Sequence, residues 1–137
     1  MTLYINTASH DEIIIALFKN KVDFNNPTEL IARKKFRAPR QQAEKLLPAI
    51  DALLSKAKIK KSSLGKIIVA NSGGGFTSLR IGVITANALG YALKIPVAAE
   101  SGAVKKFHGY SLVEPIYDRE PNIGKIKTGL RPGKKLK

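Results

Sequence analysis

The segment best suited to chemistry is a glycine-rich turn between a strand-like run and a helix-like run. Gly73, Gly74 and Gly75 follow the apolar residues 67–70 and precede Thr77. Such a turn brings backbone N–H groups close to an anion, and the N-terminus of the following helix favours negative charge. However, the turn lacks the Gly-Lys-Ser/Thr ending of a phosphate-binding loop. We therefore expect a structural reversal from strand to helix, with Thr77 or Ser78 as the helix cap, and keep anion binding as the alternative.

The carboxylates and histidines form no recognisable catalytic set. Glu100 is the best placed, because it follows an apolar strand-like run, and α/β proteins place their sites at strand ends. A strand-end cap or a solvated side chain is the alternative that we favour for it. His10 and His108 fall in a turn and in a weakly patterned segment, where solvation is the expected state.

The chain has no cysteine, which excludes thiolate zinc sites and cysteine nucleophiles. We expect no catalytic residue, no metal site and no cofactor.

The charge of the chain favours polyanionic partners. There are 24 Lys and Arg residues against 10 Asp and Glu residues, a formal net charge of +14. Such a field attracts nucleic acid, although a generally basic proteome would give the same composition. Residues 124–137 hold six basic residues and no acidic one, which predicts a disordered basic tail that strengthens contact with RNA or an RNA-bound complex. The basic residues of this tail are Lys125, Lys127, Arg131, Lys134, Lys135 and Lys137.

Length and hydrophobicity predict one globular unit with a tail. The 137 residues are 44% hydrophobic, enough for a core without disulfide bonds. The apolar run 13–18 has the length of a strand, far below the ~20 residues of a membrane span. The first residues show no secretory signal. We expect a cytoplasmic protein with no membrane partner.

The alternation of apolar residues predicts the elements that position the glycine turn. Three strands, at 2–6, 12–18 and 29–38, are joined by short links and read as an antiparallel meander. A helix over 41–57 contains Pro48, so the helix is expected either to kink there or to begin its regular part near it. Its one apolar stripe consists of Ala43, Leu46, Leu47, Ile50, Leu53, Leu54 and Ala57. The remaining elements are a strand at 67–70, a helix at 77–93 and a strand at 96–99. The order β-β-β-α-β-α-β predicts an α/β fold, a five-stranded mixed sheet with helices packed on it.

After Ser101 the periodicity of apolar residues is weaker. A helical turn is expected over 102–108. An extended edge segment is expected over 111–117, because it contains Pro115.

The helix 77–93 has two opposed apolar faces. A helix that only covers a sheet needs one apolar stripe, so a second chain is the expected cover of the other face. Packing by residues 102–117 is the alternative. The sequence does not distinguish the outward face from the inward one. The residues assigned to this partner-binding helix are Leu79, Ile81, Gly82, Val83, Ile84, Ala86, Ala88, Leu89 and Ala92.

The segment 69–82 resembles the signature of the TsaB (YeaZ) family of tRNA threonylcarbamoyladenosine biosynthesis proteins, roughly Gly-Pro-Gly-Ser-Phe-Thr-Gly-Leu-Arg-Ile-Gly after a strand. The matching residues are Phe76, Thr77, Leu79, Arg80, Ile81 and Gly82, whereas Ser72, Gly73, Gly75 and Ser78 depart from the pattern. The opening residues 3–8 are similar to the family's Leu-Ala-Ile-Asp-Thr-Ser, with Asn6 in place of Asp. Residues 46–54 and 93–97 are also similar to family segments, and 114–121 resembles its C-terminal Pro-x-Tyr-x-Arg-x-Pro stretch.

The resemblance implies an actin/Hsp70/sugar-kinase-type (RNase H-like) lobe at 1–101, a short extended segment at 102–123 and the tail at 124–137. The second lobe of the family has no counterpart in this sequence. The site residues implied are those of the glycine turn and helix start: Ser72, Gly73, Gly74, Gly75, Phe76, Thr77 and Arg80.

The function implied is that of a non-catalytic scaffold in tRNA threonylcarbamoyladenosine modification. Its expected partners are a TsaD-like catalytic subunit, a TsaE-like ATPase, tRNA through the complex, and a second copy of the chain. Asn6 supports a non-catalytic role, because a neutral amide cannot supply the charge that an Asp gives to a magnesium ion. The alternatives are a divergent ATP-binding enzyme or peptidase of the same fold, and a stand-alone RNA-binding protein.

Overall fold

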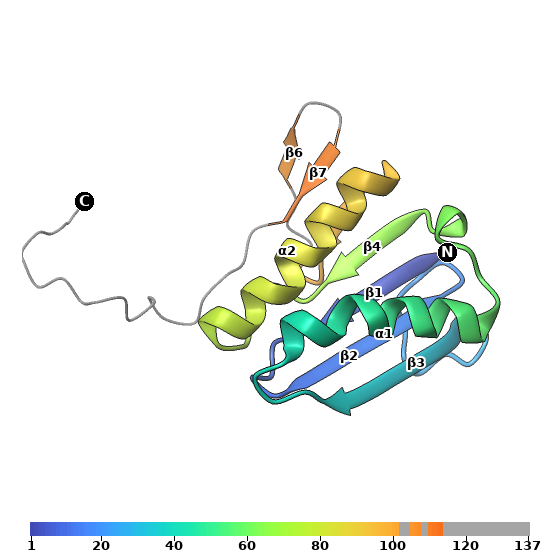
Figure 1. Ribbon diagram of the computed structural model, residues 1–137. Helices are drawn as coiled ribbons and strands as arrows, with labels where there is room; N and C mark the ends of the chain where they lie inside the picture. Colours follow the sequence, from blue (N-terminus) through green and yellow to red (C-terminus); the bar gives the residue numbers. More distant parts are fainter. Residues whose placement is uncertain (102–104, 108–109, 114–137) are drawn as a thin grey trace, which may run out of the picture.

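A five-stranded mixed sheet with two helices on one face forms the body of the molecule (Figure 1). The computed structural model describes residues 1–101, 105–107 and 110–113. The strand order is β3-β2-β1-β4-β5. The strands are β1 (Thr2–Asn6), β2 (Glu12–Phe18), β3 (Leu30–Arg37), β4 (Lys66–Val69) and β5 (Val97–Ala99), and the helices are α1 (Gln42–Ala57) and α2 (Phe76–Leu93). A short 3-10 turn, Lys61–Ser63, precedes β4.

The pairing of the strands confirms the predicted meander and the mixed sheet. β1 pairs antiparallel with β2, and β2 pairs antiparallel with β3. β4 pairs parallel with both β1 and β5. The parallel pairs require crossover connections, which α1 and α2 provide. β1 therefore lies at the centre of the sheet, and its carboxyl end meets the start of α2.

The core lies between the sheet and the two helices. Alternate residues of β1 and β2, among them Leu3, Ile5 and Ile15, pack against the buried sides of α1 and α2. The opposite face of the sheet carries a smaller cluster around Tyr4 and Phe18. The loop after β2 covers part of this second face. Its Phe24 meets the rings of Tyr4 and Phe18 edge-on at centroid distances of 5.3 and 5.0 Å.

Helix α1 follows the predicted stripe with two exceptions. Its core side is formed by Leu46, Ile50, Leu53 and Leu54. Ala43 and Leu47, which the stripe also included, are exposed instead. The helix continues through Pro48. At its start, the Gln42 side-chain amide donates to the backbone carbonyls of Ser9 and Glu12, both at 2.7 Å, which fixes α1 to the β1–β2 turn.

The segment after β5 differs from the sequence-based expectation. Residues 105–107, predicted within a helical turn, form strand β6 (Lys105–Phe107), which pairs antiparallel with β7 (Tyr110–Leu112). Short segments without apolar periodicity carry little signal to separate helix from strand. Next to β7, Val113 exchanges two hydrogen bonds with the side chain of Asn87 in α2. His108, Pro115 and the basic tail at 124–137 lie outside the described residues.

Candidate functional site

Helix α2 begins directly after the glycine turn, and its first residue corrects one prediction. Gly75 occupies the N-cap position with φ −73° and ψ 157°, and no side chain caps the helix. The hydroxyls of Thr77 and Ser78 therefore lie within the first turn, beyond the capping position, and the predicted cap is wrong. Thr77 is exposed, whereas Ser78 is buried.

Two of the three glycines are needed for the reversal. Gly73 has φ +83°, in the left-handed region that favours glycine. Gly74 has no such φ, but a Cβ there would overlap the backbone carbonyl of Ala8. Gly75 has open space around it. The expected structural role of the turn thus holds for Gly73 by conformation and for Gly74 by close approach to the β1–β2 connection.

Thr7 fixes the other side of the turn. Its hydroxyl donates to the carbonyl of Ser78 at 2.6 Å and accepts from the N–H of Gly82 at 3.0 Å. Thr7 is fully buried, and a Cβ at Gly82 would collide with its hydroxyl oxygen. The glycine at position 82 lets α2 lie directly against the end of β1. Sequence reasoning identified Gly82 but missed Thr7, because their contact depends on the packing of distant segments.

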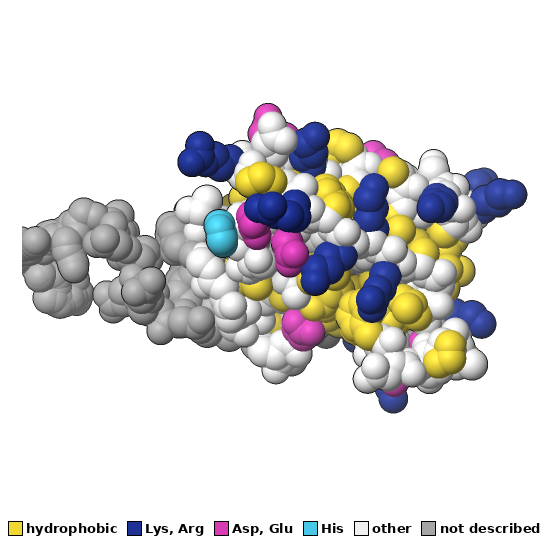
Figure 2. Space-filling model, turned by 90° about the horizontal axis from the view of Figure 1, so that it is seen from below, with side chains coloured by type: hydrophobic (Ala, Val, Ile, Leu, Met, Phe, Trp, Pro, Cys, Tyr) yellow, Lys and Arg dark blue, Asp and Glu magenta, His cyan; other side chains and the backbone are white. Residues whose placement is uncertain are grey.

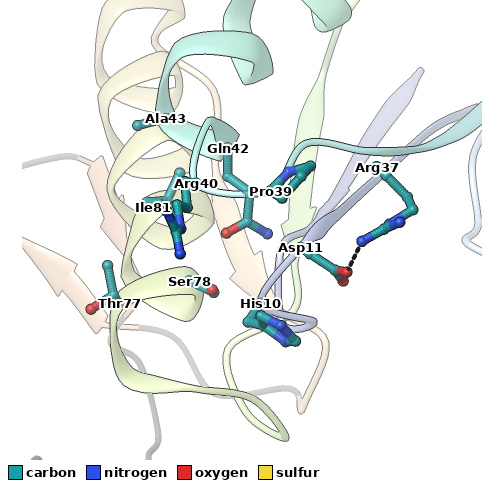
Figure 3. Close-up of a pocket in the computed structure, with 10 residues that line it drawn as sticks. All are labelled: His10, Asp11, Arg37, Pro39, Arg40, Gln42, Ala43, Thr77, Ser78 and Ile81. Atoms are coloured by element: carbon teal, nitrogen blue, oxygen red, sulfur yellow. Dashed lines mark hydrogen bonds and ion pairs between the residues drawn. The ribbon is translucent and has the colours of Figure 1, made fainter.

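A pocket opens between the β1–β2 turn, the start of α1 and the start of α2 (Figure 3). It has a volume of about 520 Å³. Figure 3 shows Asp11 and Arg37 on one side and Thr77, Ser78 and Ile81 of α2 on the other. The remaining lining residues are His10, Pro39, Arg40, Gln42 and Ala43.

The Asp11 carboxylate of this pocket is held in an ion pair. Arg37 forms an ion pair with Asp11 at 2.8 Å. The hydrogen bond from Arg37 lowers the pKa of the Asp11 carboxyl, so this group is ionised near neutral pH. A carboxylate of that kind is a poor general acid or base. His10, predicted to be solvated, is exposed at the edge of the pocket.

A second polar cluster lies on the opposite face of the sheet, where β1, β4 and β5 are adjacent. The Tyr4 hydroxyl donates to both carboxylate oxygens of Glu100 at 3.1 Å and accepts from the Asn6 amide at 3.0 Å. The Asn6 side-chain oxygen accepts from the N–H of Ala8 at 2.8 Å. Burial, reinforced by the charge of Glu100, raises the pKa of the Tyr4 hydroxyl. Asn6 is thus committed to the chain itself, and Glu100 stands at a strand end, as expected.

The two apolar faces of α2 have different environments. The inward residues Leu79, Gly82, Val83 and Ala86 are buried. The outward residues Ile84, Ala88 and Ala92 are exposed, and Ile81 and Leu89 are half-buried. On the same side of α2, Ile84 is 56% exposed and Tyr91, two turns further along, is 65% exposed. On the neighbouring helix α1, Leu47 is 47% exposed.

These exposed side chains form what we call the α1–α2 apolar surface: Leu47, Ile84, Ala88, Tyr91 and Ala92. The alternative is that residues 102–117 cover the second face. Of the described residues in that segment, β7 contacts α2 and Val113 exchanges hydrogen bonds with Asn87. Arg80 is also exposed on the outward side.

The described residues carry neither a metal-ligand cluster nor a membrane-spanning helix. In this part of the chain, no group of three or more His, Cys, Asp or Glu residues is positioned to hold a metal ion. Neither of its long helices, α1 or α2, has the length and hydropathy that crossing a membrane requires.

Comparisons with known proteins agree with this architecture. Residues 36–107, more than half of the chain, match the family model of TsaD, tRNA N6-adenosine threonylcarbamoyltransferase. The tRNA threonylcarbamoyladenosine biosynthesis protein TsaB of Bacillus subtilis is 36% identical over 88 residues, which are 61% of this chain and 38% of that protein. A tRNA N6-adenosine threonylcarbamoyltransferase of Rhodopirellula baltica is 33% identical over 96 residues, 67% of this chain and 26% of that protein.

A solved structure extends the match to three dimensions. YeaZ from Pseudomonas aeruginosa superposes with a TM-score of 0.61 at 26% identity, over 72% of this chain and 42% of that one. The chain therefore spans less than half the length of these relatives. The sheet order, the glycine turn before α2 and these matches together place the chain in the TsaB/YeaZ family, with the actin/RNase H-like fold.

Proposed function

We propose that the chain is a non-catalytic subunit of the machinery that makes N6-threonylcarbamoyladenosine in tRNA. In this role it binds a TsaD-like subunit through the α1–α2 apolar surface, and a TsaE-like ATPase joins the assembly. tRNA reaches the chain through this complex, which implies a cytoplasmic location. The names of the TsaB and threonylcarbamoyltransferase relatives support the pathway.

The observation that carries the proposal is the exposed apolar surface itself. Ile84 and Tyr91 are more than half exposed on α2, and Leu47 is 47% exposed on the neighbouring helix α1. Large apolar side chains gathered on one side mark a protein interface. The small residues Ala88 and Ala92 let a neighbouring helix approach closely.

The non-catalytic assignment is supported by the side chains around the turn. Asn6 stands where the related ATP-using folds have an Asp, and both ends of its amide are bonded within the chain. Asp11 is held by Arg37. The Asn6 amide brings no charge to a magnesium ion, and the Asp11 oxygen bound by Arg37 would have to leave that contact to accept a proton.

The direct test is co-purification of the chain with the TsaD-like subunit of the same cell. Ile84→Glu should abolish the complex, because it places a charge in the proposed interface. Ala52→Glu is the matched control, since this exposed alanine lies about 140° round α1 from Leu47. If the TsaD-like subunit co-purified equally with both variants and with the unmodified chain, the proposal would be wrong.

The same preparation tests the rival functions and the homodimer. Magnesium-dependent nucleotide binding by the isolated chain favours the enzyme alternative. Tight, salt-sensitive tRNA binding by the chain alone favours a stand-alone RNA-binding protein. If the chain self-associates through the α1–α2 apolar surface when no partner is present, Ile84→Glu should also convert that dimer into a monomer in sedimentation experiments.

A further inference from the structure

The edge strand β3 carries a row of basic side chains that the proposed helical interface does not use. Its residues include Arg33, Lys34, Lys35 and Arg37 and no acidic residue. All four are exposed. Arg37 is paired with Asp11, whereas the other three form no ion pair with any described residue. Figure 2 views the molecule from the side on which β3 lies and shows many Lys and Arg side chains across this face, with a smaller number of Asp and Glu side chains among them.

The directions of these side chains follow from the alternation of a strand. Arg33 lies over the ring of Phe24 at 5.6 Å, on the sheet face away from the helices. Lys34 lies over Phe36 at 5.1 Å, and Phe36 packs with the helix-side core. Lys35 shares the face of Arg33, about 7 Å further along the strand. Arg33 and Lys35 therefore lie on the sheet face away from the helices, whereas Lys34 lies at the sheet edge on the helix side.

The usual reason for charge on an edge strand is protection against strand pairing. Lys serves that purpose well, but β3 carries three consecutive exposed cations and no acidic residue. A regular spacing of positive charges along an extended strand matches a linear polyanion better than it matches the scattered carboxylates of a protein surface. The contact of Arg33 with Phe24 adds a guanidinium held on an aromatic ring, a group on which RNA bases stack.

We propose that Arg33, Lys34 and Lys35, here called the β3 basic surface, bind the phosphate backbone of RNA, with Arg33 and Phe24 as a stacking position beside it. The inference rests on the proposed function only for its choice of tRNA as the RNA. Because β3 is an edge strand and α2 packs on β1, β4 and β5, RNA on β3 and a protein partner on α2 can be bound together. The contact positions the RNA and carries no sequence preference of its own.

The experiment measures binding of an unmodified tRNA transcript to the full chain over a range of salt concentrations. The test variant is Arg33→Gln/Lys34→Gln/Lys35→Gln. The control is Lys56→Gln/Lys58→Asn/Lys60→Gln, which removes the same charge from three exposed lysines around the end of α1. Asn suits position 58 because Lys58 has φ +60°.

The test variant should bind about tenfold or more weakly at low salt, and its slope of log affinity against log salt should fall by about 2–3. The control should change the slope by less than one unit. If both variants lost the same RNA affinity, the effect would come from overall charge and the proposal would be overturned. An unchanged salt slope in the test variant would overturn it as well.

Three further measurements keep the result interpretable. Thermal melting checks the fold, and if the triple variant melts early, Lys35→Gln alone should still lower the slope by about one. Duplex DNA of matched length should bind more weakly than the tRNA, and equal binding would contradict the RNA assignment. Ile84→Glu should keep the RNA affinity of the unmodified chain, so failure of the partner proposal and failure of this one are separate outcomes.

Discussion

Thr7 and Gly82, which are 75 residues apart in the sequence, are joined by a hydrogen bond of 3.0 Å. The same hydroxyl donates a hydrogen bond to the carbonyl of Ser78, so one side chain binds a backbone N–H and a backbone carbonyl in a single turn of α2. Both hydrogen bonds are buried. The contact fixes the start of the proposed partner-binding helix to the central strand.

Replacing Thr7 by Val should lower the free energy of unfolding by roughly 1–3 kcal/mol, because it removes two buried hydrogen bonds between the β1–β2 connection and α2. Val keeps the volume of Thr, so packing is little changed. Urea denaturation provides the measurement. Thr7→Ser, which keeps the hydroxyl, should recover most of the loss, and equal stability of the Val and Ser variants would contradict the assigned role.

Gly74→Val should cost roughly 1–3 kcal/mol, because the new Cβ overlaps the Ala8 carbonyl and the backbone must shift. Gly75→Ala is the control, since nothing surrounds a Cβ at that position. Melting temperatures distinguish the two variants. Unchanged melting of Gly74→Val, together with loss of nucleotide binding, would instead favour the enzyme alternative.

The two faces of α2 should respond differently to a charge. Val83 is 2% exposed, so Val83→Glu buries a carboxylate and should unfold the protein. Ala88 is exposed, so Ala88→Glu should leave it folded but unable to bind a partner. Circular dichroism measures folding and gel filtration measures association. If both variants remain folded and still form the complex, this helix is not the interface.

Tyr4 should make stability depend on alkaline pH. Its pKa is raised in the folded state, first by burial and then by the charge of Glu100, whereas the unfolded chain loses this proton near the ordinary pKa of about 10. The contribution is therefore complete below about pH 10 and is lost as pH rises further. Urea titrations from neutral to alkaline pH should show a steeper decline for the unmodified chain than for Tyr4→Phe. Parallel declines would contradict the linkage.

Removal of residues 124–137 should weaken RNA contact by the assembled complex. The segment carries six basic residues and no acidic one, and each phosphate that they neutralise contributes about 0.7–0.9 to the salt slope. The slope is measured by titrating the complex with tRNA at several salt concentrations. The same slope with and without the tail would refute its role.

The strand pattern of this fold is readable from the sequence because each strand is defined by its own residues. β1 and β2 have their predicted bounds, β1 from the alternation of its residues and β2 from a run that is apolar on both sides. Both helices lie within a residue of their predicted ranges. The buried stripe of α1 was also predictable, apart from Ala43 and Leu47 at its border. These features follow from local periodicity alone.

The candidate site could not be predicted from local sequence patterns, because its contacts depend on how distant segments pack. The outward face of α2 could not be chosen from its sequence, because both faces are apolar and only the sheet decides between Val83 and Ala88. The cap was misplaced because Gly75 takes that position by backbone conformation. The bond from Tyr4 to Glu100 joins residues 96 apart, and no pattern within either segment indicates it.

The central position of β1 has a consequence for how the chain acquires its fold. The antiparallel partner of β1 follows within a few residues, but its parallel partner is distant, as the pairing of Thr2 with Lys66 shows. Closing such a long loop is slow compared with forming a hairpin. On the ribosome the β1–β3 meander can form first, with one edge of β1 open until residues 66–69 have been synthesised. That interval is when the nascent chain is most exposed to strand pairing with another chain.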